Sequence, residues 1–114
     1  MGMSAEIIAV GRYSAAIARL MDYPANYYAS TKEGTIVTRR LFGISEGSTL
    51  SYEFAALLGI SDPWDFNQHK LDGSKIDVDG LRRWAKLYSD YLDDVEAFDG
   101  LLRARFEFHF RPEG

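Results

Sequence analysis

The fold of this chain is decided by the stretch Ala104-Arg105-Phe106-Glu107-Phe108-His109-Phe110. Apolar and polar residues alternate along it without a miss, and the polar series extends to Arg103 and Arg111. A period of two is the spacing of side chains on a β-strand, where successive residues point to opposite faces. We therefore predict a strand from Ala104 to Phe110 with an apolar face on a core and a wet polar face, ended by Pro112.

A long amphipathic helix is predicted directly before this strand. Apolar residues recur there at steps of three and four, which is the stripe of a helix that covers a core. The stripe consists of Leu81, Trp84, Tyr88, Tyr91, Val95 and Phe98. Asp77 or Asp79 is the expected N-cap, and Asp99-Gly100 is the expected end.

Two elements are predicted near the N-terminus. The apolar run Ala5–Val10 indicates a strand buried on both faces and stopped by Gly11. Tyr13–Met21 follows with apolar residues at helical spacing, and Ser14 is its expected N-cap. These two elements give a strand followed by a helix.

A β-hairpin is the next expectation. Asn26–Ser30 and Thr35–Phe42 flank a short polar segment that ends in Gly34. Glycine supplies the positive φ that a short hairpin loop with a bulge requires, so we expect the two segments to pair with each other. In the second segment Arg39-Arg40 interrupts the strict alternation.

A further helix is predicted from Thr49 to Leu58. Ser48 or Thr49 can cap its beginning, and Gly59 stands where a helix-ending glycine belongs. The segment 61–75 that follows mixes turn-forming residues with aromatics and is expected to be an ordered loop.

These elements predict one α+β domain that spans residues 1–114. The order β-α-β-β-α-α-β indicates a four-stranded, mostly antiparallel sheet with two to three helices packed on one face. If the Thr49–Leu58 helix elaborates the second crossover, the order becomes the βαββαβ pattern of ferredoxin-like folds. A fold of this kind does not imply a function by itself.

Composition excludes several classes of function. The 114 residues include no cysteine, so disulfides and thiol catalysis are excluded, and a reducing cytoplasm is favoured. The net charge of −4 makes nucleic acid an unfavourable partner, because binding to it depends on neutralised phosphates. No signal peptide and no apolar run of ~20 residues is present, so we expect no membrane partner.

No cofactor or metal motif stands out. Asp72–Gly80 resembles the start of a calcium loop, but Lys75 and Lys86 occupy positions where acids are needed, and a turn followed by a helix cap explains the same aspartates. The two histidines, His69 and His109, show no zinc-ligand spacing. We therefore expect no metal, no cofactor and no catalytic residue.

The charges of the predicted long helix run against its dipole. Bases come early (Arg82, Arg83 and Lys86), and acids come late (Asp90, Asp93, Asp94 and Glu96). Helices favour the reverse by about 0.3–1 kcal/mol per exposed charge. Either Arg40, Arg103 or Arg105 neutralises the acids, or the acids form a surface with Tyr88 and Tyr91 for a basic protein partner. On the second interpretation, charge reversal of the acids is expected not to lower stability.

Three functions follow in order of preference. The first is a non-enzymatic cytosolic protein-binding module that uses the acidic helix end, with Asp90, Asp93, Asp94, Glu96, Tyr88 and Tyr91 as its contact residues. As a small, acidic, cysteine-free α+β domain the chain is similar in kind to bacterial immunity proteins and other small inhibitors, although no single motif carries this similarity. A homodimer through an open sheet is also compatible with the expected fold.

The second function is a small enzyme or ligand-binding domain. Its pocket would lie near the 61–75 loop and would use His69, Asp65 and Trp64. The third is a transcription regulator, because Ala55–Ser61 resembles the centre of a helix-turn-helix. The segment after it, which contains Pro63 and two aspartates, is a poor recognition helix.

Overall fold

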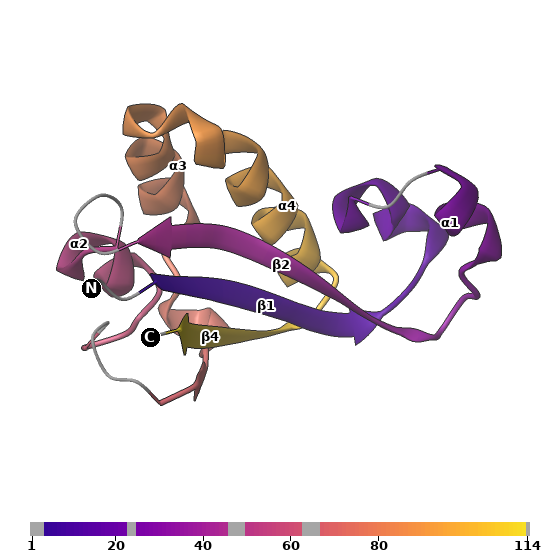
Figure 1. Cartoon of the computed structure of the whole chain (residues 1–114), viewed down its shortest axis with the longest axis horizontal. Helices are drawn as coiled ribbons and strands as arrows, with labels where there is room; N and C mark the ends of the chain where they lie inside the picture. The colour runs from indigo at the N-terminus through magenta and orange to yellow at the C-terminus, as the bar shows by residue number, and fades with distance from the viewer. Residues whose placement is uncertain (1–3, 23–24, 46–49, 63–66, 114) are drawn as a thin grey trace.

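The computed structural model describes residues 4–22, 25–45, 50–62 and 67–113 and shows an α+β fold (Figure 1). A four-stranded sheet has the order β2-β1-β4-β3, and every neighbouring pair is antiparallel. The strands are β1 (Ser4–Arg12), β2 (Ile36–Ser45), β3 (His69–Lys70) and β4 (Glu107–Glu113). The predicted fold class is confirmed.

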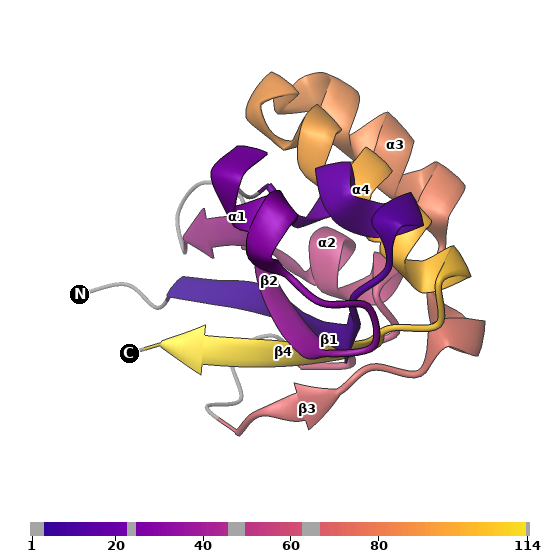
Figure 2. The same cartoon turned by 90° about the vertical axis from the view of Figure 1, so that its right-hand side faces the viewer.

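Helices cover one face of this sheet. α3 and α4 lie across it, whereas α1 and the preceding 3-10 helix extend beyond the far end of the β1–β2 pair (Figures 1 and 2). The α-helices are α1 (Ala25–Ser30), α2 (Tyr52–Leu57), α3 (Val78–Leu87) and α4 (Leu92–Arg103). The 3-10 helices are η1 (Ala15–Met21), η2 (Gly73–Lys75) and η3 (Ser89–Tyr91).

The last strand is confirmed with shifted ends. β4 pairs with β1 from Val10–Glu107 to Ser4–Glu113. Phe106, Phe108 and Phe110 are buried in the core, as the alternation predicts. The prediction is wrong at both ends, because Ala104 is the C-cap of α4 and the strand continues past Pro112.

The first strand also departs from its prediction. Only Ala5, Ile7 and Ala9 are buried, while the residues between them are partly exposed. The expectation of a strand buried on both faces is therefore wrong, since the helices cover only one face of the sheet. The strand also runs past Gly11 to Arg12.

The predicted β-hairpin does not form. Residues 26–30 belong to α1, and the Tyr27 carbonyl accepts hydrogen bonds from the Thr31 N–H and from the Ser30 and Thr31 hydroxyl groups. β2 pairs with β1 instead, and Gly34 lies in the preceding turn with a φ of +83°. A helical segment takes the place of a strand, so the ferredoxin-like order is not confirmed.

α2 is shorter than predicted. Its N-cap is Ser51, whose hydroxyl accepts the Phe54 N–H at 3.1 Å, whereas the predicted caps Ser48 and Thr49 lie outside the described residues. Gly59 follows the helix with a φ of +74°, as predicted.

The predicted long helix is two helices. α3 ends at Leu87, η3 intervenes, and α4 turns back across the sheet (Figure 1). Tyr88 leaves the helical region with a φ of −133°, and Asp99-Gly100 lies inside α4 rather than at its end. The break lets both halves of the apolar stripe pack on one core, where Leu81 and Phe98 are fully buried.

This break resolves the apparent conflict with the helix dipole. Asp93 and Asp94 lie in the first turn of α4, and Arg103 lies in its last turn. Asp79 and Lys86 have the same favourable placement on α3. Each helix therefore follows the expected polarity of charges. The dipole conflict from which tolerance of charge reversal was expected does not exist in this structure.

A β-bulge at Phe42 shapes the centre of the molecule. The β1–β2 register shifts by one residue between Ala5 and Ile7, and Phe42 adopts a φ of +56°. The extra residue turns both Leu41 and Phe42 toward the helices, where both are buried. A bulky residue at positive φ is strained, so its surroundings must hold it in place.

Three side chains hold the bulge. The Asp94 carboxylate accepts the Phe42 N–H at 3.0 Å, and the Tyr91 hydroxyl donates to the Gly43 carbonyl at 2.7 Å. Arg39 lies 3.6 Å from Asp94 and also donates to the Leu20 carbonyl. We call these three residues, Arg39, Tyr91 and Asp94, the bulge clamp.

We expect Asp94→Ala to lower the free energy of unfolding by about 2–3 kcal/mol, because it leaves the Phe42 N–H without its acceptor and the mostly buried Arg39 guanidinium without its carboxylate partner. Asp93→Ala is the matched control, since Asp93 is the exposed neighbour in the same helical turn, and it should cost at most about 0.5 kcal/mol. Urea unfolding of both variants measures the difference. Equal losses would contradict the clamp.

α4 ends in a Schellman turn. The Phe106 N–H donates to the Leu101 carbonyl, and the Arg105 N–H donates to the Leu102 carbonyl, each at 3.1 Å. Arg105 takes the left-handed position of this motif with a φ of +64°, where glycine is the usual residue.

Arg105→Gly should therefore raise the free energy of unfolding by about 0.5–1 kcal/mol, because glycine relieves the left-handed strain at the cost of a more flexible unfolded chain. Ala104→Gly, at the preceding residue with a φ of −80°, should be neutral or destabilising. Thermal or urea unfolding gives the sign, and a loss of stability in Arg105→Gly would show that its side chain contributes to the fold.

Candidate functional site

The structure divides the six predicted contact residues into two groups. Tyr91 and Asp94 belong to the bulge clamp, and Glu96 accepts a hydrogen bond from the Arg82 Nε at 2.8 Å. Tyr88, Asp90 and Asp93 remain at the surface where α3 gives way to α4. Half of the acidic helix end therefore forms internal contacts.

Arg82 neutralises most of the acids on the outer side of α3 and α4. Its guanidinium lies 2.9 Å from Asp79, 2.8 Å from Glu96 and 2.7 Å from Asp99. The hydrogen bond with Glu96 is the main cause that raises the pKa of Arg82 above its ordinary value. Because this network is exposed, it contributes little to stability.

The arginines that the sequence suggested as neutralising partners behave differently from one another. Arg103 lies 3.1 Å from Asp99. Arg40 instead pairs with Glu6 at 3.7 Å on the open face of the sheet, where Arg111 also reaches Glu6. Arg105 makes no ion pair with a described residue. The open sheet face therefore carries balanced charges.

Burial is the largest influence on the pKa of Asp94. Loss of water raises its pKa above the ordinary value of 3.8, although the Phe42 N–H and Arg39 act in the opposite direction. The native protein therefore holds the Asp94 proton more tightly than the unfolded chain does. Protonation of Asp94 therefore stabilises the native protein. This stabilisation is complete at pH values below the pKa of Asp94 in the unfolded chain, and it is lost as the pH rises through the pKa of Asp94 in the native protein.

The unfolding free energy of the wild type relative to Asp94→Asn should accordingly fall as the pH rises above 3.8, the ordinary pKa of an aspartate. Asparagine keeps an oxygen acceptor for the Phe42 N–H but cannot ionise. Urea unfolding at a series of pH values measures this difference. A difference that grows with pH would mean that Asp94 has a depressed pKa and a net favourable charge.

An apolar surface lies where α3 meets α4. Leu87 is 74% exposed, Tyr88 37% and Leu92 40%. Asp90 and Asp93 border these side chains, and neither forms an ion pair with a residue in the described part of the chain. We call this surface, Leu87, Tyr88, Asp90, Leu92 and Asp93, the α3–α4 corner.

The corner is supported from beneath. The Tyr88 ring packs on Trp84 with 5.1 Å between ring centroids, and Trp84 packs on Phe54 at 4.7 Å. The backbone of Tyr88 is fixed as the C-cap of α3, since its N–H donates to the Ala85 carbonyl. A rigid aromatic base therefore presents the two leucines to solvent.

Leu87 and Leu92 were missed by the sequence analysis. A single long helix explains Tyr88 and Tyr91 as core residues and leaves both leucines on the polar side. Two leucines that do not fit an otherwise regular stripe were the signal in the sequence. They indicated either a break in the helix or an exposed apolar surface.

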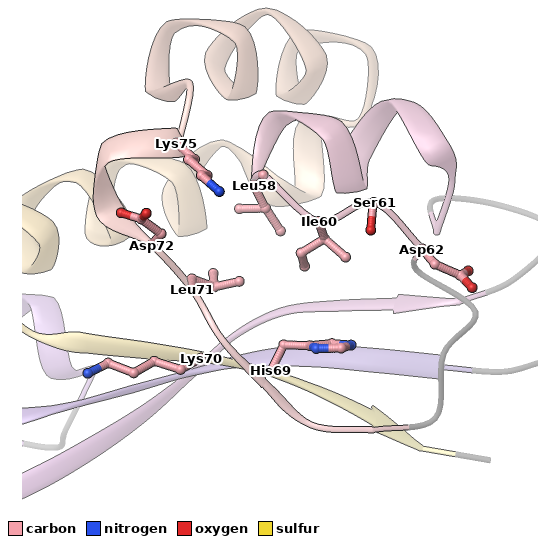
Figure 3. A pocket seen from close by; sticks show the side chains of 10 residues that line it. Leu58, Ile60, Ser61, Asp62, His69, Lys70, Leu71, Asp72 and Lys75 are labelled. Carbon is pink, nitrogen blue, oxygen red and sulfur yellow. The ribbon is translucent and has the colours of Figure 1, made fainter.

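A hollow lies at the place of the predicted ligand pocket. It has a volume of about 220 Å³ and lies between the end of α2 and β3 (Figure 3). His69 lies along one wall below Ile60, and Leu58 and Leu71 form the inner part (Figure 3). Of the three residues proposed for this pocket, Asp65 and Trp64 lie outside the described residues.

The charged residues around this hollow already have structural contacts. Asp72 caps η2, and its hydrogen bonds with Ser74, the hydroxyl contact first, lower its pKa. Lys70 turns away from the hollow (Figure 3) and lies 3.4 Å from Glu107. Asp77 caps α3 by accepting the Gly80 N–H at 2.9 Å, which confirms the turn-and-cap interpretation of the apparent calcium loop.

Two other sites find no support in the described residues. No described residue between Gly59 and Gly73 is helical, and residues 63–66 of the segment weighed as a recognition helix lie outside the described residues. In the part of the chain that the structure covers, no three histidine or acidic side chains are grouped to hold a metal ion. None of the helices described is long and apolar enough to cross a membrane.

Comparison of the chain with protein-family models, with curated proteins and with solved structures found no match.

Proposed function

We propose that this chain is a non-enzymatic protein-binding module that contacts its partner through the α3–α4 corner. The observation that carries the proposal is the clustering of exposed apolar side chains there. Six large hydrophobic residues are exposed among those described, and three of them, Leu87, Tyr88 and Leu92, lie within six residues of one another. Exposed apolar side chains gathered in one place mark interaction surfaces.

The chemistry of the corner resembles the centre of a protein interface. An aromatic residue on a rigid base loses little conformational entropy on binding, and flanking leucines can fill a pocket on the partner. Asp90 and Asp93 at the rim favour a partner that carries basic residues around an apolar centre, because opposite charges speed encounter. The net charge of −4 likewise favours a basic partner.

This proposal narrows the surface expected from the sequence. The clamp and the Arg82 network occupy Tyr91, Asp94 and Glu96, so the contact depends on Tyr88, Asp90 and Asp93 together with the two leucines. A cytosolic role as an inhibitor, or one like that of an immunity protein, belongs to the same proposal. The absence of cysteine supports the cytosol.

Capture experiments with the full chain test the proposal. The immobilised wild type should retain, from a lysate of its source organism, a protein that Leu87→Ser/Leu92→Ser does not retain. Asp90→Asn/Asp93→Asn should weaken retention at low salt and have less effect at high salt, because exposed charges are screened. The expected loss for the leucine variant is at least about 10-fold.

Tyr27→Ser is the matched control. Tyr27 is also an exposed large hydrophobic residue, at 47%, but it lies on α1, at the other end of the molecule from the corner (Figure 1). Retention should survive this change. A captured protein that binds the wild type and the leucine variant equally would contradict the proposed surface. Self-association that the leucine variant abolishes would instead identify a second copy as the partner.

A ligand-binding role is the second candidate, because a hollow exists where it was predicted. The hollow beside His69 is smaller than the usual 300–1,000 Å³ of ligand sites. If it is the functional site, His69→Ala should abolish activity or binding while the corner variants leave it intact. The reverse pattern supports the protein-binding proposal.

A further inference from the structure

A second hollow lies where β1 extends beyond the end of its pairing with β4. The last β1–β4 pair is Val10–Glu107, whereas Gly11 and Arg12 pair only with β2. The end of α4 approaches this open stretch of β1 and leaves a hollow of about 480 Å³. It is lined by Val10, Gly11, Arg12, Ile36, Ala104, Arg105 and Glu107. We call it the notch. The ends of β1 and α4, which line it, lie away from the turn between α3 and α4 (Figure 1).

Two packing features create the notch. The Phe106 ring lies directly against Gly11, where a Cβ atom would be only 2.6 Å from the ring, so glycine is required for this close approach. The Schellman turn then carries the chain from α4 into β4 and places Arg105 beside the open end of β1. The Gly11–Phe106 contact is part of the core and backbone hydrogen bonds fix the Schellman turn, so the notch is preformed.

The notch is locally cationic. Neither Arg12 nor Arg105 forms an ion pair with a described residue, and Arg12 is oriented by a hydrogen bond from its Nη1 to the Gly34 carbonyl at 3.2 Å. Glu107, the acid of the notch, lies 3.4 Å from Lys70 and is thereby partly neutralised. Both guanidinium groups are therefore available to an anionic ligand.

The backbone of Arg105 gives an independent indication. A left-handed φ at a residue other than glycine costs of order 1–3 kcal/mol and is often found at functional sites. Glycine would serve the Schellman turn better. The presence of arginine at this position is explained if its guanidinium contacts a ligand.

We propose that the notch binds a carboxylate attached to a short apolar chain. The planar guanidinium forks of Arg12 and Arg105 match a carboxylate, with which they can form paired hydrogen bonds. Val10, Ile36 and Ala104 supply an apolar floor for the carbons next to it. The carboxylate belongs either to a small organic acid or to the free C-terminus of a peptide that extends along the unpaired part of β1.

NMR titration of the full chain tests this proposal. Hexanoate represents the small acid, and acetyl-valyl-alanyl-valine with a free C-terminus represents the peptide. At least one of them should shift the Gly11, Arg12 and Arg105 amide signals saturably, with a Kd on the order of 1–10 mM for so small a ligand. The probe that binds with the lower Kd, hexanoate or the peptide, identifies the source of the carboxylate.

Neutral probes test the contribution of the arginines to binding, and a purely anionic probe tests the contribution of the apolar floor. Hexanamide and the amidated peptide should bind at least about 10-fold more weakly than the acids, because they lack the charge that the arginines contact. Inorganic phosphate should also be weaker, since it has no apolar chain. Equal binding of an acid and its amide, or equal binding of phosphate and hexanoate, would overturn the proposal.

Arg105→Gly is the decisive variant, because it removes the guanidinium while favouring the fold. It and Arg12→Gln should each weaken binding of the tighter acid by about 10-fold. Arg83→Ala, which removes an exposed arginine of α3, is the matched control and should leave the affinity unchanged. A folded Arg105→Gly protein that keeps the wild-type affinity, or the absence of any saturable shift up to about 20 mM acid, would overturn the proposal.

Discussion

The contact between the Asp94 carboxylate and the Phe42 N–H is the constraint on which the rest of the structure depends. It joins the first turn of α4 to the bulge of β2 across 52 residues of sequence. The bulge turns Phe42 into the core, where its ring meets those of Phe54 and Phe98 at 5.6 Å each. The backbone strain at Phe42 persists because α4, η3 and β2 all hold it.

The same constraint decides where a partner can bind. Asp94 looks like a surface residue in the sequence, but the clamp requires both Asp94 and Tyr91 to face the sheet. Their inward placement forces the chain to turn sharply between α3 and α4, and this turn leaves Leu87 and Leu92 without a core position. The exposed corner is therefore a consequence of the way in which α4 is anchored on β2.

The local patterns of the last strand and of the start of α3 were read correctly from the sequence, whereas the local signals around Gly34 were misread and the long-range constraints were missed. The alternation through Phe110 and the helix cap at Asp77 depend on near neighbours in sequence, so both were predicted. The break at Tyr88 was missed because the apolar stripe continues with the same spacing on both sides of it. α1 also departs from local propensity, since its tyrosines favour a strand, whereas the Tyr27 carbonyl accepts local hydrogen bonds from Ser30 and Thr31. No local signal shows that Leu41 and Phe42 share a face, because the bulge depends on a residue of α4.

The most direct test of this account is the pH titration of the Phe42 amide proton by NMR. If the Asp94 carboxylate accepts this hydrogen bond, the amide signal should move downfield as the carboxylate ionises. The midpoint should lie above 3.8, the ordinary value for an aspartate, because burial raises the pKa of Asp94. A Phe42 amide signal that is insensitive to pH, or a midpoint below that value, would contradict the account.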